Sequence, residues 1–421
     1  MREMKDSGVE WIGEIPKEWD LVQLGSIFFE HKQKNLGMQS NNLLSLSYGR
    51  IIRKDINSSD GLLPKNFDGY NIINSDDIVL RLTDLQNDQR SLRVGFSYEN
   101  GIITSAYVTL RKRNSLINCL FFYFLIHCYD ILKGFYGMGA GVRQGLNYDG
   151  IKKIRLTLPP IDEQATIAKF LSSKINQADA LIANQQTQIE KLKAYKQSLI
   201  TEVVTKGLDP DVPMKDSGVE WIGMIPEHWE IQKLKTRTNM LTPMRDKPAD
   251  LSGPIPWIRI EDYSGKYISS SKEHLGVSAD TVKAMNLKIY PIGTVLCTSS
   301  CDLGKCAIVE KELVSNQRFI GIIPTYRLSS EFLYYLMLSN AERLNTLSTG
   351  SIQANLSRVE FEQLLVQFPP LNEQLEITQH LDKKCTMVDY LIDITQTKIK
   401  KLEQYKKSLI YEYGTGKREV M

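Results

Sequence analysis

The feature of this sequence that most constrains its fold is an internal repeat with a period of 210 residues. The segment MKDSGVEWIGEIPKEWD at residues 4–20 returns as MKDSGVEWIGMIPEHWE at residues 214–230. A longer match aligns residues 158–207 with residues 368–417 without a gap. The regions between the matched pieces have little in common. The chain is therefore predicted to contain two pseudo-repeats of one structural unit, each with its own variable region.

The repeat also predicts how the chain is divided, since 421 residues are too many for one ordinary core. The predicted parts are a first variable domain (1–157), a first long helix (158–207), a turn-forming linker (208–213), a second variable domain (214–367), a second long helix (368–417) and a tail (418–421).

Each long repeat is predicted to form one helix. A Pro-Pro pair stops the preceding element, and Glu163 or Glu373 then suits the positive N-terminal end of a helix. Apolar residues recur at heptad spacing, and a helix cannot bury such a seam alone. The two helices are therefore predicted to pair as an antiparallel coiled coil, the alternative being that each lies on its own domain. The predicted seam residues are Leu171, Ile175, Ile182, Ile189, Leu192 and Leu199 in the first helix, and Leu381, Val388, Ile392, Ile399, Leu402 and Leu409 in the second.

The variable regions are predicted to be α/β (α+β) domains rich in strands. Short β-branched and aromatic runs, such as DDIVLRLTD at 76–84 and RFIGIIPTYRLS at 318–329, alternate with turn residues. A helix-like stretch follows in each region, beginning at Cys119 or Ser330, and then a glycine-rich or polar loop. The order of elements matches although the residues do not, which favours one fold carrying two specificities.

No catalytic motif in the sequence is complete. The phosphate-binding pattern GxxxxGK[ST] fails at Gly304-Lys305 and at Gly416-Lys417, because neither pair has the required earlier glycine. The Pro-Pro pairs lack the polar and aromatic flanks that an amino-group DNA methyltransferase uses. Of six cysteines only Cys297, Cys301 and Cys306 cluster, with no neighbouring histidine to complete a zinc site. The chain is predicted to hold no catalytic centre, metal or cofactor of its own.

The net charge of +3 argues against a generally sticky polycation, yet the excess of basic residues falls in the variable regions. Arginine, glutamine and asparagine are the side chains that recognise guanine and adenine edges in DNA. They gather in strand–turn segments and in the loops after the helices. For any one of them an ordinary solvated surface position is the alternative. The candidate DNA contacts are Arg81, Gln86, Arg90, Arg93, Arg143 and Gln144 in the first region, and Arg259, Lys305, Asn316, Gln317, Arg318, Gln353 and Asn355 in the second.

No apolar run approaches the roughly 18–20 residues that span a bilayer, and the first residues lack an apolar signal-peptide core. These features predict a cytoplasmic location. The tryptophans of the short repeat recur with it, which favours a structural role. We expect the short repeat to pack where one long helix ends and the next domain begins, with residues 416–421 near the start of the chain.

Several segments together resemble the specificity subunits of type I restriction–modification systems. They are DSGVEWIGEIPKEW (6–19) with its second copy, LPPIDEQ (158–164), FPPLNEQ (368–374), SLITEVVTKG (198–207) and GTVLCTSSCDLGKCAIV (293–309). The second helix departs from this pattern, ending in LIYEYGTGK.

The resemblance implies two target-recognition domains, each recognising one half of an asymmetric bipartite sequence in double-stranded DNA. It implies that the two helices set the spacer and dock two methyltransferase subunits and two restriction–translocase subunits. S-adenosylmethionine, ATP and Mg²⁺ are then expected on those partner subunits. The main rival hypothesis is a coiled-coil scaffold with two protein-binding domains and no role in DNA recognition.

Overall fold

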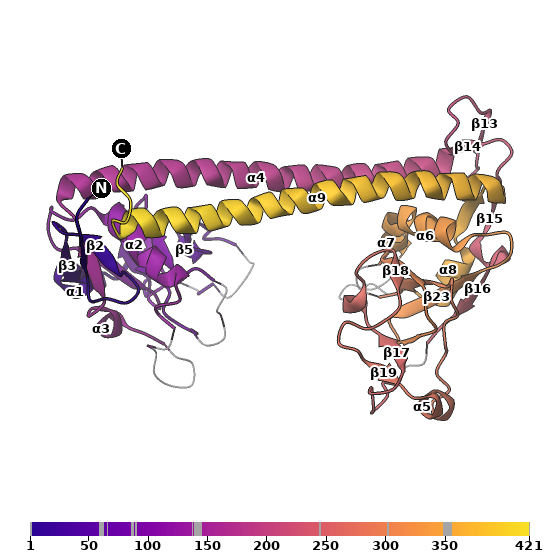
Figure 1. Cartoon of the computed structure of the whole chain (residues 1–421), viewed down its shortest axis with the longest axis horizontal. Coiled ribbons are helices and arrows are strands. Elements are labelled where there is room, and N and C mark those ends of the chain that lie inside the picture. Colours follow the sequence, from indigo (N-terminus) through magenta and orange to yellow (C-terminus); the bar gives the residue numbers. More distant parts are fainter. Residues whose placement is uncertain are drawn as a thin grey trace. The chain divides into compact units, whose positions relative to one another are not determined.

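The computed structural model describes residues 2–58, 63–64, 66–85, 88, 91–136, 138, 145–243, 246–300, 303–347 and 356–420. They belong to two compact units. Unit 1 comprises residues 1–186 and 397–421, and unit 2 comprises residues 187–396. The division cuts both long helices, α4 (Ile161–Lys206) and α9 (Leu371–Gly414), so that each unit contains a part of each (Figure 1).

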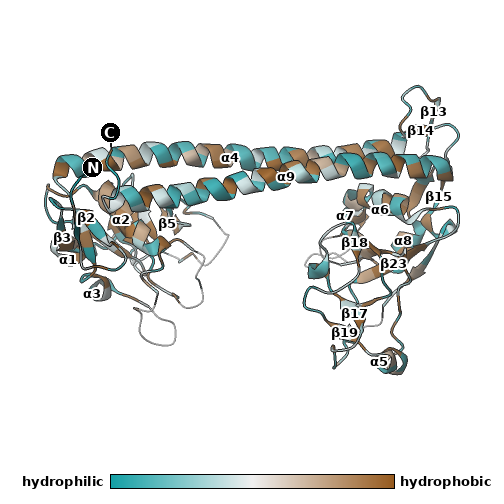
Figure 2. Ribbon diagram, in the orientation of Figure 1, coloured by the Kyte–Doolittle hydropathy of each residue, from teal (hydrophilic) through white to brown (hydrophobic). Residues whose placement is uncertain are grey.

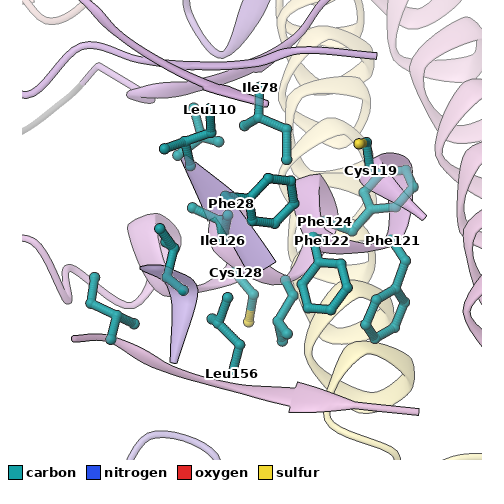
Figure 3. Close-up of a cluster of buried hydrophobic side chains, with 14 of the residues drawn as sticks. Phe28, Ile78, Leu110, Cys119, Phe121, Phe122, Phe124, Ile126, Cys128 and Leu156 are labelled. Atoms are coloured by element: carbon teal, nitrogen blue, oxygen red, sulfur yellow. The ribbon is translucent and has the colours of Figure 1, made fainter. Parts of the chain in front are cut away.

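Unit 1 is built on a four-stranded antiparallel sheet with α2 (Cys119–Ile131) packed on it. The strand order is β4 (Phe28–Glu30), β11 (Val108–Lys112), β8 (Ile78–Leu80), β9 (Val94–Phe96). The rings of Phe28 and Phe122 meet edge to face with centroids 5.6 Å apart. Figure 3 shows these rings among the apolar side chains that the sheet and α2 contribute to the core. Two outer strand pairs are β5 (Leu44–Ser47) with β6 (Arg50–Arg53), and β7 (Asn71–Ile73) with β10 (Gly101–Ile103).

Unit 2 repeats this plan with one more strand in the main sheet. Its order is β16 (Thr238–Leu241), β23 (Phe319–Pro324), β20 (Val295–Thr298), β21 (Cys306–Val309), β18 (Tyr267–Ile268). The helices α6 (Ser330–Ser339) and α7 (Ala341–Leu347) stand where unit 1 has α2. A second sheet has the order β19 (Gly276–Val277), β17 (Ile255–Ile258), β22 (Val314–Ser315), and α5 spans Ala279–Ala284. The predicted common order of elements is confirmed.

The short sequence repeat forms the same elements in both units. A two-stranded hairpin is followed by a strand that pairs with the strand before the Pro-Pro pair, in identical register: Asp20 faces Leu158, and Glu230 faces Phe368. In unit 1 these strands are β1 (Met4–Asp6), β2 (Glu14–Pro16), β3 (Asp20–Gln23) and β12 (Arg155–Leu158). In unit 2 they are β13 (Met214–Asp216), β14 (Met224–Pro226), β15 (Glu230–Lys233) and β24 (Leu365–Phe368). The short helices are α1 (Leu24–Ile27), α3 (Tyr148–Ile151), α8 (Arg358–Gln363), η1 (Leu234–Thr236) and η2 (Ile260–Asp262).

Within each unit, the parts of α4 and α9 run antiparallel to one another. In unit 1 the rings of Phe170 and Tyr413 lie 4.6 Å apart, and Asp179 pairs with Lys406 further along. In unit 2 the Lys196 ammonium lies 2.7 Å from the Asp389 carboxylate. All twelve predicted seam residues are buried or half-buried, and Figure 2 shows apolar and polar residues alternating along both helices. A coiled coil along their full length stays a prediction. Among the described residues, no helix combines the length and apolarity needed to cross a membrane.

Candidate nucleic-acid interface

In unit 1, the predicted DNA contacts come from the segment that joins β8 to β9 and from the loop after α2. The backbone ties these two segments together, because Leu146 N–H donates to the carbonyl of Leu82 at 2.8 Å. Arg81 N–H also donates to the carbonyl of Arg93 at 2.9 Å across the base of the β8–β9 connection. One end of the main sheet therefore carries both segments.

Unit 2 forms the corresponding arrangement at the end of β20 and β21. Leu356 N–H donates to the carbonyl of Ser299 at 2.8 Å, and Leu356 stands 210 residues after Leu146. Ser299 N–H in turn donates to the carbonyl of Arg318 at 2.8 Å. Asn316 N–H donates to the carbonyl of Ile258 at 3.3 Å, at the end of β17. The β20–β21 connection, the turn before β23 and the residue Leu356 are thus bonded to one another at one end of the sheet.

Four of the predicted contacts in unit 2 share this end of the sheet. Lys305 ends the β20–β21 connection, while Asn316, Gln317 and Arg318 form the turn that leads into β23. The Asn316 side chain accepts a hydrogen bond from Arg318 N–H at 3.0 Å, which shapes the turn. Lys305, Gln317 and Arg318 are exposed. Two cations and one amide consequently face solvent at this end of the sheet.

Arg81 and Arg93 in unit 1 have different environments. Arg81 is half-buried, and its guanidinium lies 3.9 Å from the Asp88 carboxylate. Arg93 is fully buried, and its guanidinium donates to backbone carbonyls of the β8–β9 segment. The prediction that Arg93 contacts DNA is therefore wrong for this conformation, because every atom of its side chain is covered by protein.

Arg259, in contrast, is half-buried and takes part in ion pairs near the surface of unit 2. Its guanidinium lies 2.9 Å from Glu273, 3.3 Å from Glu261 and 4.0 Å from Asp262. The hydrogen bond with Glu273 is the main reason why the pKa of Arg259 is raised, although desolvation opposes the shift. Three carboxylates lie near this cation, and its role as a DNA contact stays a prediction. The remaining predicted contacts lie outside the described residues: Gln86, Arg90, Arg143, Gln144, Gln353 and Asn355.

The structure gives no sign of a catalytic or metal centre in the part of the chain that it describes. No group of three or more histidine, cysteine or acidic side chains there could hold a metal ion. The described cysteines are free and buried, and burial raises the pKa of the Cys119 thiol to about 11 and that of Cys128 to about 12. Protonated thiols are weak nucleophiles and weak metal ligands.

The function of the repeated Glu-Gln pair was not recognised from the sequence. The Trp19 indole N–H donates to the Glu163 carboxylate at 2.8 Å, and Trp229 donates to Glu373 at 2.9 Å. The side-chain oxygen of the following glutamine, Gln164 in unit 1, accepts the N–H of the residue that caps α2 at 2.9 Å. Glutamate and tryptophan recur together in both repeats, and that joint recurrence is the signal from which their contact could have been inferred.

The predicted closure of unit 1 by its last residues is confirmed. Lys417 Nζ donates to the carbonyl of Ile12 at 2.6 Å, and Gly416 lies against Pro16 and Trp19. In unit 2, Gly207 lies against Trp229 in the same way. Both glycines have positive φ angles, 74° and 78°, which other residues adopt with strain.

Comparison with known proteins decides the family. The sequence model of the type I restriction modification DNA specificity domain matches residues 16–191 and 227–404. This chain belongs to that family. It is a type I specificity subunit with two target-recognition domains, and as such it is a non-catalytic chain, in agreement with the incomplete catalytic motifs.

Two relatives named as specificity subunits are similar in sequence to this chain. It is 25% identical over 422 residues to the MjaVIII specificity subunit of Methanocaldococcus jannaschii, covering 96% of this chain and 93% of that protein. It is 32% identical over 188 residues to the MjaIX specificity subunit of the same organism, covering 43% and 42% of the two chains.

Two solved structures share the fold of the specificity subunit. One, from work on complex assembly and conformational transition of the type I restriction–modification system, has a TM-score of 0.72 at 14% identity, with coverage of 96% and 99%. The other is the HsdS subunit from Thermoanaerobacter tengcongensis, with a TM-score of 0.52 at 14% identity and coverage of 98% and 100%.

Proposed function

We propose that units 1 and 2 each recognise one half of an asymmetric bipartite sequence in double-stranded DNA. The hydrogen bonds from Leu146 to Leu82 and from Leu356 to Ser299 carry this proposal, because they build the same support for two different sets of side chains. Loops on a common support can exchange side chains without changing the fold. Two different sets of loop side chains are expected to recognise two different half-sequences of one target.

The contacts in unit 2 suit duplex recognition. Lys305 and Arg318 are exposed cations that can neutralise phosphates, and Gln317 can bond to a base edge in the major groove. Phosphate contacts hold a protein on the duplex, and base contacts set its sequence preference. Arg81, together with the predicted contacts outside the described residues, would serve the same purpose in the first half.

We further propose that α4 and α9 keep the two halves at a fixed spacing, as an antiparallel coiled coil. Support comes from the antiparallel contacts within each unit and from the buried seam residues. Two recognition domains meet both halves of a split target only when their separation matches the DNA between those halves. A stiff helix pair holds such a separation, whereas a flexible linker does not.

Exposed apolar residues on the helices support docking of partner subunits. Leu181 and Tyr405 in unit 1 are 51% and 48% exposed, and their repeat counterparts in unit 2, Leu391 and Tyr195, are 43% and 52% exposed. Leu181 lies two residues after Asp179 and Tyr405 one residue before Lys406, so both stand at the level of that ion pair. A rotation of about 100° per residue turns both side chains away from the pair.

The two units thus carry the same leucine–tyrosine pair, as expected for two copies of one partner. We assign these patches to two methyltransferase subunits, which would supply S-adenosylmethionine. Two restriction–translocase subunits, with ATP and Mg²⁺, would complete the assembly, and the cytoplasm is its expected location.

The central test uses the complex of this chain with its methyltransferase subunit. Sequencing of methylated adenines in DNA modified by that complex should yield a two-part asymmetric target, and footprinting should yield two protected patches. Replacing residues 21–157 by the equivalent region of another family member should change one half of the target only. Absence of two protected patches would favour the scaffold hypothesis, and a change in both halves would contradict independent recognition.

A pair of point variants tests the proposed face of unit 2. Lys305→Ala should weaken DNA binding and lower its dependence on salt, because one phosphate contact is removed. Lys311→Ala is the matched control, because Lys311 is an exposed lysine beyond the other end of β21. Equal effects of the two substitutions would show that the DNA does not prefer this end of the sheet.

An insertion tests the spacing role of the helices. Adding about four residues, one helical turn, near Gln185 should lengthen the gap between the two recognised halves while their sequences stay the same. An unchanged methylation target in the insertion variant would contradict the proposal that the helices set the spacer.

A further inference from the structure

Arg93 is a buried cation whose five N–H donors all have acceptors within unit 1. Nη1 donates to the carbonyls of Arg81 at 3.2 Å and Thr83 at 2.7 Å. Nη2 donates to the carbonyls of Asp84 at 3.2 Å and Asp88, and Nε donates to the Tyr136 hydroxyl at 3.0 Å. The Arg93 residue is 0% exposed. An arginine guanidinium has no further donor, so this site is saturated.

The four carbonyl acceptors all belong to the segment that leaves β8, and Arg93 itself stands at the entry to β9. The β8–β9 segment therefore curves around the Arg93 guanidinium. Arg93 is also anchored to α2, because its backbone N–H donates to the Asp130 carboxylate at 2.6 Å. The curve of this segment is thus defined by contacts to one side chain.

Tyr136 extends the same contacts to the second predicted recognition segment. Its hydroxyl donates to the carbonyl of Asp88 at 3.2 Å, and its ring centroid lies 5.4 Å from the Arg93 guanidinium carbon. Tyr136 immediately precedes residues 137–145, which contain the glycine-rich loop of the sequence. Leu146, at the far end of that loop, is bonded to Leu82. Both segments are consequently joined around Arg93.

We propose that Arg93 is a positioning residue for the sequence specificity of unit 1. It holds residues 81–84 and 88 together with Tyr136 in one arrangement, and so fixes where the β8–β9 segment and the loop after α2 leave the sheet. This inference rests on the proposed function, since it assumes that these two segments contact DNA. Arg93 itself contacts no base.

The geometry requires arginine and not merely a positive charge. A guanidinium presents five donors in a rigid planar fork, whereas a lysine ammonium has three donors at a single point. Arg93→Lys keeps the charge but can satisfy only part of the carbonyl set. Tyr136→Phe keeps the ring and removes only the hydroxyl that bridges Arg93 and Asp88.

Unit 2 offers the matched control, because different side chains contact the described part of its corresponding segment. There the Asn345 side chain donates to the carbonyl of Leu303 at 3.2 Å, and Gly304 lies against Ala341. A substitution at Asn345 should therefore affect the second half of the target, and substitutions at Arg93 the first.

The test uses the full chain in complex with its methyltransferase subunit. Binding is measured to the cognate duplex and to duplexes altered in the first or the second half, for the wild type and for Arg93→Lys, Tyr136→Phe and Asn345→Ala. We expect Arg93→Lys to lose about tenfold or more of the discrimination in the first half, comparable to the loss of one well-placed base contact. Tyr136→Phe should lose about threefold there, since one of the five donors loses its acceptor. Asn345→Ala should affect only the second half.

Amide hydrogen exchange of β8, β9 and β11 in the same samples separates positioning from general unfolding. Protection of these strands should stay unchanged in Tyr136→Phe, which remains informative if Arg93→Lys does not assemble. Unchanged first-half discrimination in the folded variants would overturn the proposal, and so would an equal loss in both halves. If the wild-type complex itself shows no bipartite preference, it is the proposed function that fails, and that outcome is visible before any variant is compared.

Discussion

The two units hold corresponding loops by different chemistry. Asp130 lies twelve residues after the Asn118 cap of α2, and Ala341 lies twelve residues after the Ser329 cap of α6, so the two positions correspond. In unit 1, Asp130 accepts the N–H of Arg93. In unit 2, Ala341 packs against Gly304, whose φ angle is 95°.

The difference shows that the support of a recognition loop can change completely while its position is conserved. A buried polar network specifies one loop shape through directional hydrogen bonds. A contact between small residues does so through the close approach of two backbone segments. The junction of helix and short repeat behaves in the opposite way, since Trp19–Glu163 and Trp229–Glu373 are the same in both units. The tryptophan–glutamate contact is constant between the units, whereas the contacts that hold the loops differ.

The largest effect is expected for Gly304→Ala. A Cβ at this position would overlap the Cβ of Ala341 and lie 2.8 Å from its Cα, and the φ angle of 95° disfavours any side chain. We expect a loss of about 3 kcal/mol in the free energy of unfolding of unit 2, from overpacking and backbone strain. Amide exchange of β20 and β21 measures this loss. Gly265→Ala is the control in the same unit, because nothing lies within 4 Å of its added Cβ; equal effects would show that the contact with Ala341 is unimportant.

The next effect concerns the shared junction. Glu163→Ala and Glu373→Ala should each lower the free energy of unfolding of their own unit by about 2 kcal/mol, because a fully buried tryptophan loses a charged acceptor for its N–H. Thermal unfolding with local amide exchange measures both. Exposed Glu376, one turn further along α9, provides Glu376→Ala as control. A large effect in one unit only would contradict the equivalence of the two junctions.

A pH-dependent difference between the units follows from His127 in α2. Among the described residues its Nδ1 has no hydrogen-bond partner, and burial lowers the pKa of His127 to about 4, helped by the nearby charge of Lys406. The imidazole is neutral in the folded unit, so folding opposes protonation. Stability is therefore complete above the unfolded pKa of about 6.5 and is lost as the pH falls through the folded value of about 4.

His127→Leu should remove this loss, which we place on the order of 2 kcal/mol for unit 1 between pH 6.5 and pH 4. Leucine is the natural residue at the corresponding position of α6, Leu338, so unit 2 serves as the internal reference. Acid unfolding followed by amide exchange of α2 and α6 gives the measurement. Identical acid sensitivity of the wild type and the variant in unit 1 would rule out His127 as its cause.

The smallest effect separates the helix ion pairs of the two units. Asp179 accepts from both Arg50 and Lys406, whereas among the described residues Asp389 pairs with one cation, Lys196. We expect Asp179→Asn to cost about 1 kcal/mol and Asp389→Asn about 0.5 kcal/mol or less, since exposed pairs are weak. Urea unfolding at low and high salt should show both costs shrinking as salt rises. Asp393→Asn on the exposed face of α9 is the control, and a salt-independent effect of Asp179→Asn would exclude an electrostatic origin.

Much of the fold could be predicted because its signals are local or repeated. The heptad spacing of residues such as Leu171 and Leu381 identifies the buried stripe of each helix without knowledge of its neighbour. The Pro-Pro pairs mark where strands β12 and β24 end and α4 and α9 begin. The exposure of Lys305, Gln317 and Arg318 could also be predicted, because turn residues that join strands at a sheet end are usually exposed.

Arg93 was misjudged because a cation in a turn has the same sequence signature whether it faces solvent or its own protein. The sequence by itself determined that two like units exist, which elements they contain and which helix stripes are buried. Only the tertiary structure decided which arginines are enclosed, which glutamate receives which tryptophan, and how each loop is held. Those outcomes depend on contacts between residues far apart in the chain, such as Trp19 and Glu163, which are 144 positions apart. A local sequence pattern cannot predict contacts over such separations.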